Sequence, residues 1–228
     1  MREFWEQVAE AAARILSCPT CQASAAGPTS GRHPGERGLP QPGWVGPQFQ
    51  PGTGVVIVLR NPAVADDSYG TAREQQAQRR LRLFAQAPTV EAYRQFVQES
   101  IRDVVGDPAA GKRPWRKWTH PVSKVVDGYL HPEQLAWLNV VRHRTPASGS
   151  TGRKDAPVSD AAIAHGIGSH LRPELELLQP AAVVSIGSVA RDAVEAVPGS
   201  WRRFSLKLQG ASDKEAYAIR DQLRAFRG

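Results

Sequence analysis

The stretch Val55-Val56-Ile57-Val58-Leu59-Arg60-Asn61-Pro62 decides the fold of this 228-residue chain. Five consecutive apolar residues, mostly β-branched, predict a strand that is buried on both faces, as in a parallel sheet. Similar apolar runs occur at 137–141 and 182–186, and we expect a last strand near 203–208. Parallel strands need long crossover connections, which are usually helices.

Segments with helical periodicity separate these strands. We expect helices at 3–16, 71–86, 89–104, 132–137, 188–196 and 213–226. A further helix should begin at a cap residue, Ser159 or Asp160, and end near Leu178, with Leu171 and Leu175 facing inward. The expected fold is therefore α/β, a three-layer sandwich with a central, mostly parallel four-stranded sheet flanked by helices.

Three segments are expected to be loops. Residues 22–54 are rich in Gly and Pro, residues 105–124 are basic and contain Pro, and residues 147–157 are rich in Ser, Gly and Thr. We expect the apolar end of the first loop to dock on the core. The chain then divides into an N-terminal part, 1–54, and a main domain, 55–228, which together form one structural unit.

Composition and charge restrict the class of protein. Lys and Arg number 29 and Asp and Glu number 22, which gives a net charge of +7 and favours a polyanionic partner. No apolar run approaches the length needed to cross a bilayer, and the N-terminus lacks a signal-peptide pattern, so we expect a cytoplasmic protein that does not bind membranes. Cys18 and Cys21 are the two cysteines, and their spacing suggests metal or redox chemistry.

Two basic segments contain aromatic residues. The loop 111–120 has no acidic residue, and its Lys, Arg and Trp side chains are Lys112, Arg113, Trp115, Arg116, Lys117 and Trp118. A second cluster combines Trp201, Arg202, Arg203 and Lys207. Because cations neutralise phosphates and indoles stack on bases, we expect both to contact nucleic acid. The alternative is a solvated charged loop whose tryptophans pack on the core.

Residues 55–63, 138–146 and 175–190 together resemble the uracil-DNA glycosylase superfamily, most closely its iron–sulfur branch. The first segment resembles the strand and turn of that superfamily's first motif. The second is similar to the branch's Thr-Asn-Val-Val-Lys-Cys-Arg-Pro-Pro stretch, and the third to its helix–Pro–strand–Leu-Gly-x-x-Ala segment. The resemblance implies a monomeric DNA-binding enzyme without an organic cofactor, which flips uracil or another modified base out of single- or double-stranded DNA and hydrolyses its N-glycosidic bond.

The resemblance also implies roles for single residues. Asn61 would orient the attacking water, Asn139 would read the base edge, and Tyr69 and Arg60 would bind the base. The bland alternatives are a turn-capping Asn61, an Asn139 that bonds its own backbone, and a Tyr69 in the core.

The sequence departs from the family pattern at two places. Leu59 stands where the first motif has Gly, and the His-Pro-Ser motif that stabilises the leaving base is absent. Gln209 or Lys207 would take over that stabilisation. Because a neutral amide stabilises an anion less well, a catalytically inactive DNA-binding or lesion-sensing module on the same fold is the alternative.

A metal site is the last expectation. In the iron–sulfur branch four cysteines hold a cluster, and Cys18 and Cys21 match the first two. His143 stands at the third position, and His165 or His170 lies near the fourth. Two Cys with two His is a zinc pattern by ligand type, and an iron–sulfur cluster is the other possibility. The alternative is a Cys-x-x-Cys motif that has lost its metal.

Overall fold

The computed structural model describes residues 2–25, 39–60, 72–105, 120–126, 129–142, 147–148, 154–155, 158–207 and 212–227. Contacts divide the chain into two compact units that are interleaved along the sequence. The first unit comprises residues 1–43, 60–96 and 139–174, and the second comprises 44–59, 97–138 and 175–228. The sequence predicts a division between residues 54 and 55, with both parts forming one structural unit.

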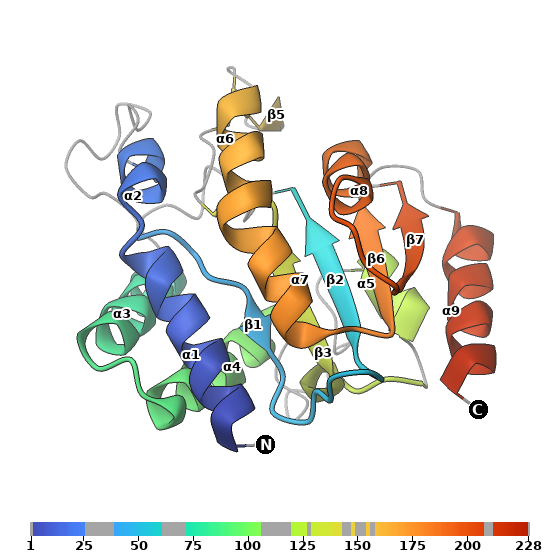
Figure 1. Cartoon of the computed structure of the whole chain (residues 1–228), viewed down its shortest axis with the longest axis horizontal. Helices are drawn as coiled ribbons and strands as arrows, with labels where there is room; N and C mark the ends of the chain where they lie inside the picture. The colour runs from blue at the N-terminus through green and yellow to red at the C-terminus, as the bar shows by residue number, and fades with distance from the viewer. Residues whose placement is uncertain are drawn as a thin grey trace. The chain divides into compact units, whose positions relative to one another are not determined.

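The second unit is built on a five-stranded sheet (Figure 1). Its strands lie in the order β1-β3-β2-β6-β7. They are β1 (Trp44–Val45), β3 (Leu135–Asn139), β2 (Val55–Leu59), β6 (Ala182–Ile186) and β7 (Arg202–Leu206). β6 runs parallel to both β2 and β7, and β1 is antiparallel to β3. The α/β class with a mostly parallel sheet is thus confirmed.

The fifth strand is β1, which lies in the segment that we expected to be a loop. The Trp44 ring stacks on Trp137 of β3, with centroids 6.0 Å apart. The backbone N–H of Gly46 donates to Leu135 O at 2.8 Å. The expected docking of this apolar segment on the core is confirmed, since Trp44 and Val45 are both buried. An isolated apolar pair in a Gly/Pro-rich region carries no period from which a strand can be predicted.

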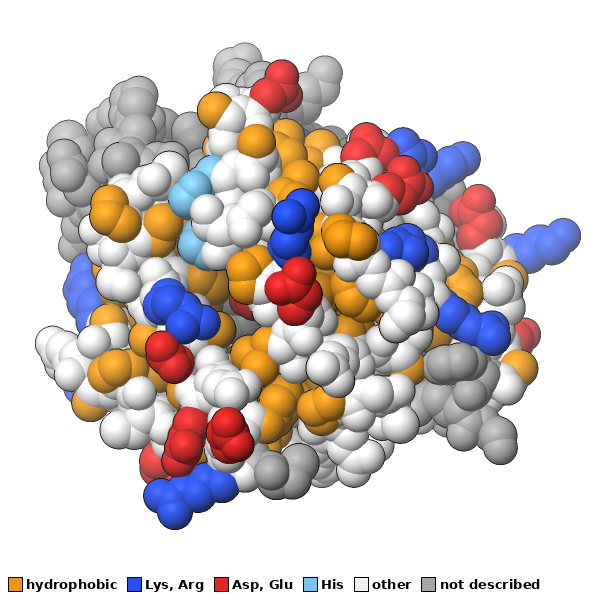
Figure 2. All heavy atoms as spheres, viewed as in Figure 1, with side chains coloured by type: hydrophobic (Ala, Val, Ile, Leu, Met, Phe, Trp, Pro, Cys, Tyr) orange, Lys and Arg blue, Asp and Glu red, His pale blue; other side chains and the backbone are white. Residues whose placement is uncertain are grey.

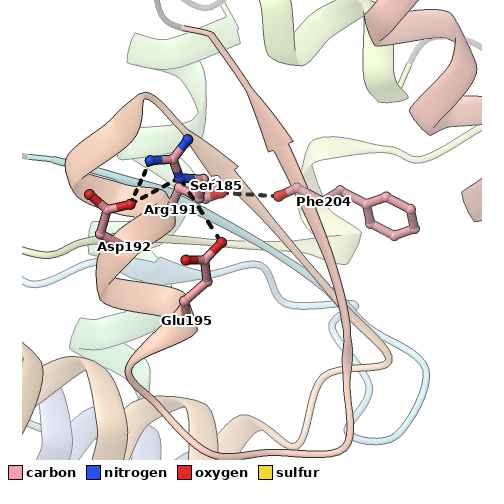
Figure 3. A network of polar contacts seen from close by, with 5 residues as sticks. All are labelled: Ser185, Arg191, Asp192, Glu195 and Phe204. Atoms are coloured by element: carbon pink, nitrogen blue, oxygen red, sulfur yellow. Dashed lines mark hydrogen bonds and ion pairs between the residues drawn. The ribbon is translucent and has the colours of Figure 1, made fainter.

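Helices cover the sheet of the second unit. The helix α8 (Ser188–Glu195) packs on β6 and β2, and α9 (Asp213–Arg227) packs on β7 and on α5 (His120–Val126). The ion pair between Lys124 and Asp213 joins α5 to α9. Figure 3 shows polar contacts near α8: Arg191 pairs with Asp192 and Glu195 on the same helix.

The first unit is mainly helical. Its N-terminal helices are α1 (Arg2–Leu16) and α2 (Pro19–Ala25), followed by α3 (Ala72–Gln86) and the first half of α4 (Val90–Val105). α1 packs on α3, and an aromatic cluster of Phe84, Tyr93 and Phe96 joins α3 to α4. The other helical segment comprises α6 (Asp160–Gly166), a π-helical turn (Ile167–Leu171) and α7 (Arg172–Leu178), which continues into the second unit.

Most predicted elements agree with the structure, and several of the exceptions lie in the expected loops. α2 extends into the segment 22–54, and α5 begins at His120 within the expected basic loop 105–124 and continues to Val126. β4 (Ala147–Ser148) and β5 (Lys154–Asp155) form a short antiparallel pair in the expected insert. The expected helix at 132–137 is only a 3₁₀ turn (Pro132–Gln134), and β3 starts directly after it. Among the described residues, no helix combines the length and apolarity that crossing a membrane requires.

Candidate metal centre

Four side chains of the first unit converge on one point. The ligand atoms of Cys18, Cys21, His165 and His170 all lie within 4.8 Å of one another. Cys18 Sγ is 3.3 Å from His165 Nε2, and Cys21 Sγ is 3.1 Å from His170 Nε2. The two segments that supply these ligands are far apart in sequence, since Cys18 and His165 are separated by 147 positions and Cys21 and His170 by 149. Thiolate and imidazole are the usual ligands of zinc and of other soft or borderline metals.

The connection between α1 and α2 places the cysteines. Ser17 Oγ donates to Ala13 O at 3.1 Å and closes the last turn of α1. Pro19 then begins α2, where a missing N–H costs nothing because the first helical N–H groups have no partner within the helix. Gln22 N donates to Cys18 O at 2.9 Å. Since Cys18 and Cys21 are three residues apart on this turn, both side chains lie on one face.

The π-helical turn places the histidines. His165 and His170 are five residues apart, which in an α-helix would put their side chains about 140° apart. The wider π turn over Ile167–Leu171 reduces this angle and brings both rings to the same side. Their centroids lie 5.1 Å apart in an edge-to-face arrangement. Figure 1 shows α6 continuing through this turn into α7, and Figure 2 shows histidine side chains reaching the surface beside this helical segment.

Two local features fix the position of this helical segment. Ser159 caps its start, because Ser159 Oγ accepts from Ala162 N at 3.2 Å, and this confirms one of the two predicted caps. Gly166 lies against the backbone that follows β3. A Cβ atom on Gly166 would be 2.0 Å from Val140 O, so only glycine permits this close approach.

Burial favours the neutral forms of two of the ligands, Cys21 and His170. The pKa of the Cys21 thiol is raised to about 12, mainly because the side chain is buried and also because Cys18 is close. The pKa of His170 is lowered to about 3, mainly because the ring is buried and also because of the charges of Arg142 and His165. A neutral imidazole has a free lone pair for a metal. Ser169 Oγ lies 3.2 Å from His165 Nδ1, which leaves Nε2 of that ring directed at Cys18.

A buried ion pair lies beside the four ligands. Arg142 is 1% exposed, and its Nη2 donates to the carboxylate of Glu174. Burial raises the pKa of Glu174, and the neighbouring Arg142 opposes this shift. This pair could not be predicted from the sequence, because an Arg after a strand and a Glu in an amphipathic helix are usually exposed.

The metal prediction is partly met. Cys18, Cys21 and His165 lie together as predicted, and His170, which the sequence left as an alternative to His165, joins the same group. His143 lies outside the described residues. The two histidines were alternatives because the insert at 147–157 loosens the alignment at the fourth ligand position, and nothing in the sequence announced the π turn.

The residues predicted to bind the base are only partly described. Asn139 is 7% exposed at the carboxyl end of β3, and Arg60 is half-buried directly after β2. Val141 N donates to Arg60 O at 2.8 Å, so the segments that follow the two strands lie side by side. Leu59, the departure from the family pattern, is half-buried. Asn61 and Tyr69 lie outside the described residues.

The predicted DNA contacts on β7 are exposed. Arg202, Arg203 and Lys207 are all accessible to solvent. The Arg203 guanidinium donates to Val197 O at 2.9 Å and lies 5.6 Å from the centre of the Trp201 ring, so part of its hydrogen-bonding capacity is used within the fold. Gln209 and the whole cluster Lys112, Arg113, Trp115, Arg116 and Lys117 lie outside the described residues.

Comparison of the chain with models of known protein families finds no matching family, and comparison with curated proteins finds no significant match.

Proposed function

We propose that this chain is a DNA-binding protein related to the uracil-DNA glycosylases, which removes uracil or another modified base and holds one zinc ion at Cys18, Cys21, His165 and His170. The convergence of these four ligands is the observation that carries the proposal. The resemblance located ligands in the Cys-x-x-Cys motif and in the helix before β6. Because the two segments are far apart in sequence, proximity along the chain does not explain why the Cys and His side chains converge. A shared metal ion would explain it.

The distances between ligand atoms favour one ion over a cluster. Around a tetrahedral zinc ion, sulfur and nitrogen ligands lie about 3.6 Å apart, given Zn–S near 2.3 Å and Zn–N near 2.0–2.1 Å. The observed contacts of 3.1 and 3.3 Å, and the limit of 4.8 Å for all pairs, fit this geometry after a small expansion. In an iron–sulfur cluster the ligands bind different irons and are spread further apart.

The zinc ion would have a structural role. All four positions of a tetrahedral ion would be filled by protein ligands, and closed sites of this kind stabilise a fold and do not activate water. The ion would hold the connection between α1 and α2 against the helical segment that carries His165 and His170. Metal analysis of the purified protein tests this: we expect about one zinc per chain, whereas iron with acid-labile sulfide would support a cluster instead.

The proposed chemistry lies where β2 and β3 end. In parallel α/β sheets, sites form beyond the carboxyl ends of the strands. The hydrogen bond from Val141 to Arg60 supports this location, because it brings the segment after Asn139 next to the one that leads into Asn61. We propose that Asn61 orients the attacking water and that Asn139 binds the edge of the flipped base. Gln209 or Lys207 would stabilise the negative charge on the leaving base.

Oligonucleotide cleavage tests the catalytic part of this proposal. Single- and double-stranded DNA containing uracil is incubated with the protein and then treated with alkali. We expect cleavage, and a loss of at least about a hundredfold in Asn61→Ala, the size expected for a group that orients the reacting water. Gln48→Ala is the control, because this amide pairs with Glu133 near the amino end of β3. DNA binding without cleavage would support the inactive module. The absence of both binding and cleavage would refute the proposal.

A further inference from the structure

Arg142 has hydrogen-bonding groups that the fold does not use. Its side chain is fully buried, and one of its nitrogens, Nη2, binds Glu174. The other two, Nε and Nη1, are buried and have no hydrogen-bond partner among the described residues. A buried donor without an acceptor costs free energy, and the cost is larger for a charged group. An acceptor that appears only when the site is filled would remove this cost.

The guanidinium lies beside the cysteine and histidine ligands. Glu174, its partner, follows His170 by four residues on the same helical segment, which is about one turn. The charge of Arg142 also acts on two ligands, since it lowers the pKa of Cys21 and that of His170. Cys21 Sγ is in turn 3.1 Å from His170 Nε2, so the guanidinium lies near the buried half of the ligand set, Cys21 and His170.

We propose that Arg142 is a positioning residue of the metal centre and donates a hydrogen bond from one of its two unpartnered N–H groups, on Nε or Nη1, to the Cys21 sulfur when the ion is bound. This inference rests on the proposed metal site. A thiolate bound to zinc keeps part of its negative charge, and N–H donors around metal ligands orient them and strengthen binding. Zinc with two thiolates and two neutral imidazoles carries no net charge, and Glu174 balances Arg142. Arg142 would therefore strengthen zinc binding through a directed N–H donor and not through its charge.

The competing explanation is that Arg142 only forms a structural ion pair. Its backbone also contributes to the fold, because Arg142 O accepts from Gln41 N at 2.6 Å. A structural role predicts lower stability in a variant but no change at the sulfur. The test must therefore observe the sulfur directly as well as the affinity.

Zinc affinity and the spectrum of the Co²⁺-substituted protein provide this test. Zinc affinity is measured by competition with a chelator, and the thiolate-to-cobalt charge-transfer band reports on the sulfur. In Arg142→Met we expect zinc binding to weaken by about 10- to 100-fold, the usual effect of losing such a partner of a metal ligand. The thiolate-to-cobalt charge-transfer band should move to lower energy, because the Cys21 sulfur loses its hydrogen bond from Arg142. Arg172→Met, an exposed arginine on α7, is the control and should behave as wild type.

Arg142→Lys decides the question if Arg142→Met does not fold. Lysine keeps a cation opposite Glu174 but lacks the forked donors, so zinc affinity should still fall and the cobalt band should still move. Wild-type affinity, or an unchanged cobalt band, in the folded variant would overturn the role of Arg142 and leave the metal site intact. Failure of the wild-type protein to bind either ion would overturn the metal site and this inference together.

Discussion

Replacing Gly166 by alanine tests the geometry of the metal centre most directly. The added Cβ would lie 2.0 Å from Val140 O, whereas carbon and carbonyl oxygen normally approach to about 3.3 Å. The helical segment 160–178 must therefore move by about 1.3 Å relative to the backbone after β3. Gly168→Ala is a matched control on the same segment, since nothing lies within 4 Å of the Cβ position there.

The two alanines should have opposite effects on stability. Both gain up to about 1 kcal/mol in helical preference when glycine is replaced. Only Gly166→Ala also pays for overpacking, which typically costs about 1–3 kcal/mol, and here the obstacle is a backbone carbonyl. We expect the two variants to differ by roughly 2–3 kcal/mol in the free energy of unfolding. For a chain of this size, that corresponds to about 4–12 °C in Tm.

The assay combines unfolding with zinc binding. Thermal and urea unfolding of the metal-free proteins measure the difference in stability, and chelator competition measures zinc affinity. Because the movement displaces His165 and His170 from Cys18 and Cys21, Gly166→Ala should also bind zinc more weakly, whereas Gly168→Ala should not. Equal stability and equal zinc affinity of the two variants would refute the close approach of this helix to Val140 and the placement of the histidines derived from it.

Further predictions concern the metal, its surroundings and the DNA. Removing the ion with a chelator should lower Tm in scanning calorimetry, and Cys21→Ser should be insensitive to the chelator; an equal loss in both proteins would contradict a site at Cys21. Ser169→Ala should weaken zinc binding by about tenfold in a competition titration, because His165 loses the partner of its Nδ1; unchanged affinity would show that this contact does not orient the ring. Asn139→Ala should abolish the preference for uracil-containing over normal DNA while leaving salt-dependent binding intact, which competition binding measures; a retained preference would remove Asn139 from the base site. Replacing Arg113, Arg116 and Lys117 by Gln should reduce the slope of log affinity against log salt by up to about 0.9 per lost phosphate contact, whereas Arg191→Gln, whose guanidinium already pairs with Asp192 and Glu195, should not.

The sheet could be predicted because its strands carry an unmistakable signal. Val55–Leu59 and Ala182–Ile186 are short and rich in β-branched apolar residues, and such runs have few alternatives in a protein of this size. The helices around them have clear apolar faces, as in α1 and α8. Trp44–Val45 was missed because its strand character depends on Trp137, which is distant in sequence.

For the candidate metal centre, the residue types of the ligands could be predicted from the sequence, but the four individual residues only in part. Cys-x-x-Cys is a local pattern, so Cys18 and Cys21 could be assigned from sequence alone. The participation of both His165 and His170 depends on a change of helical pitch, which no residue pattern reports. Arg142 was missed for a related reason, since its burial is decided by Glu174 on a helix that begins 30 residues later in the chain.

A single ion at this site would crosslink two distant parts of the chain. Cys18 and His165 are 147 positions apart, so coordination would close a ring that comprises most of the polypeptide. Tethers across so long a ring restrict the denatured ensemble strongly, by about 4–5 kcal/mol in the chain-entropy description of crosslinks. The same separation makes the ring slow to close, because its two ends must find each other through diffusion of an expanded coil. Zinc would therefore reach its final coordination late in folding. Loss of the zinc ion would release α1 and α2 from the histidine-bearing helical segment.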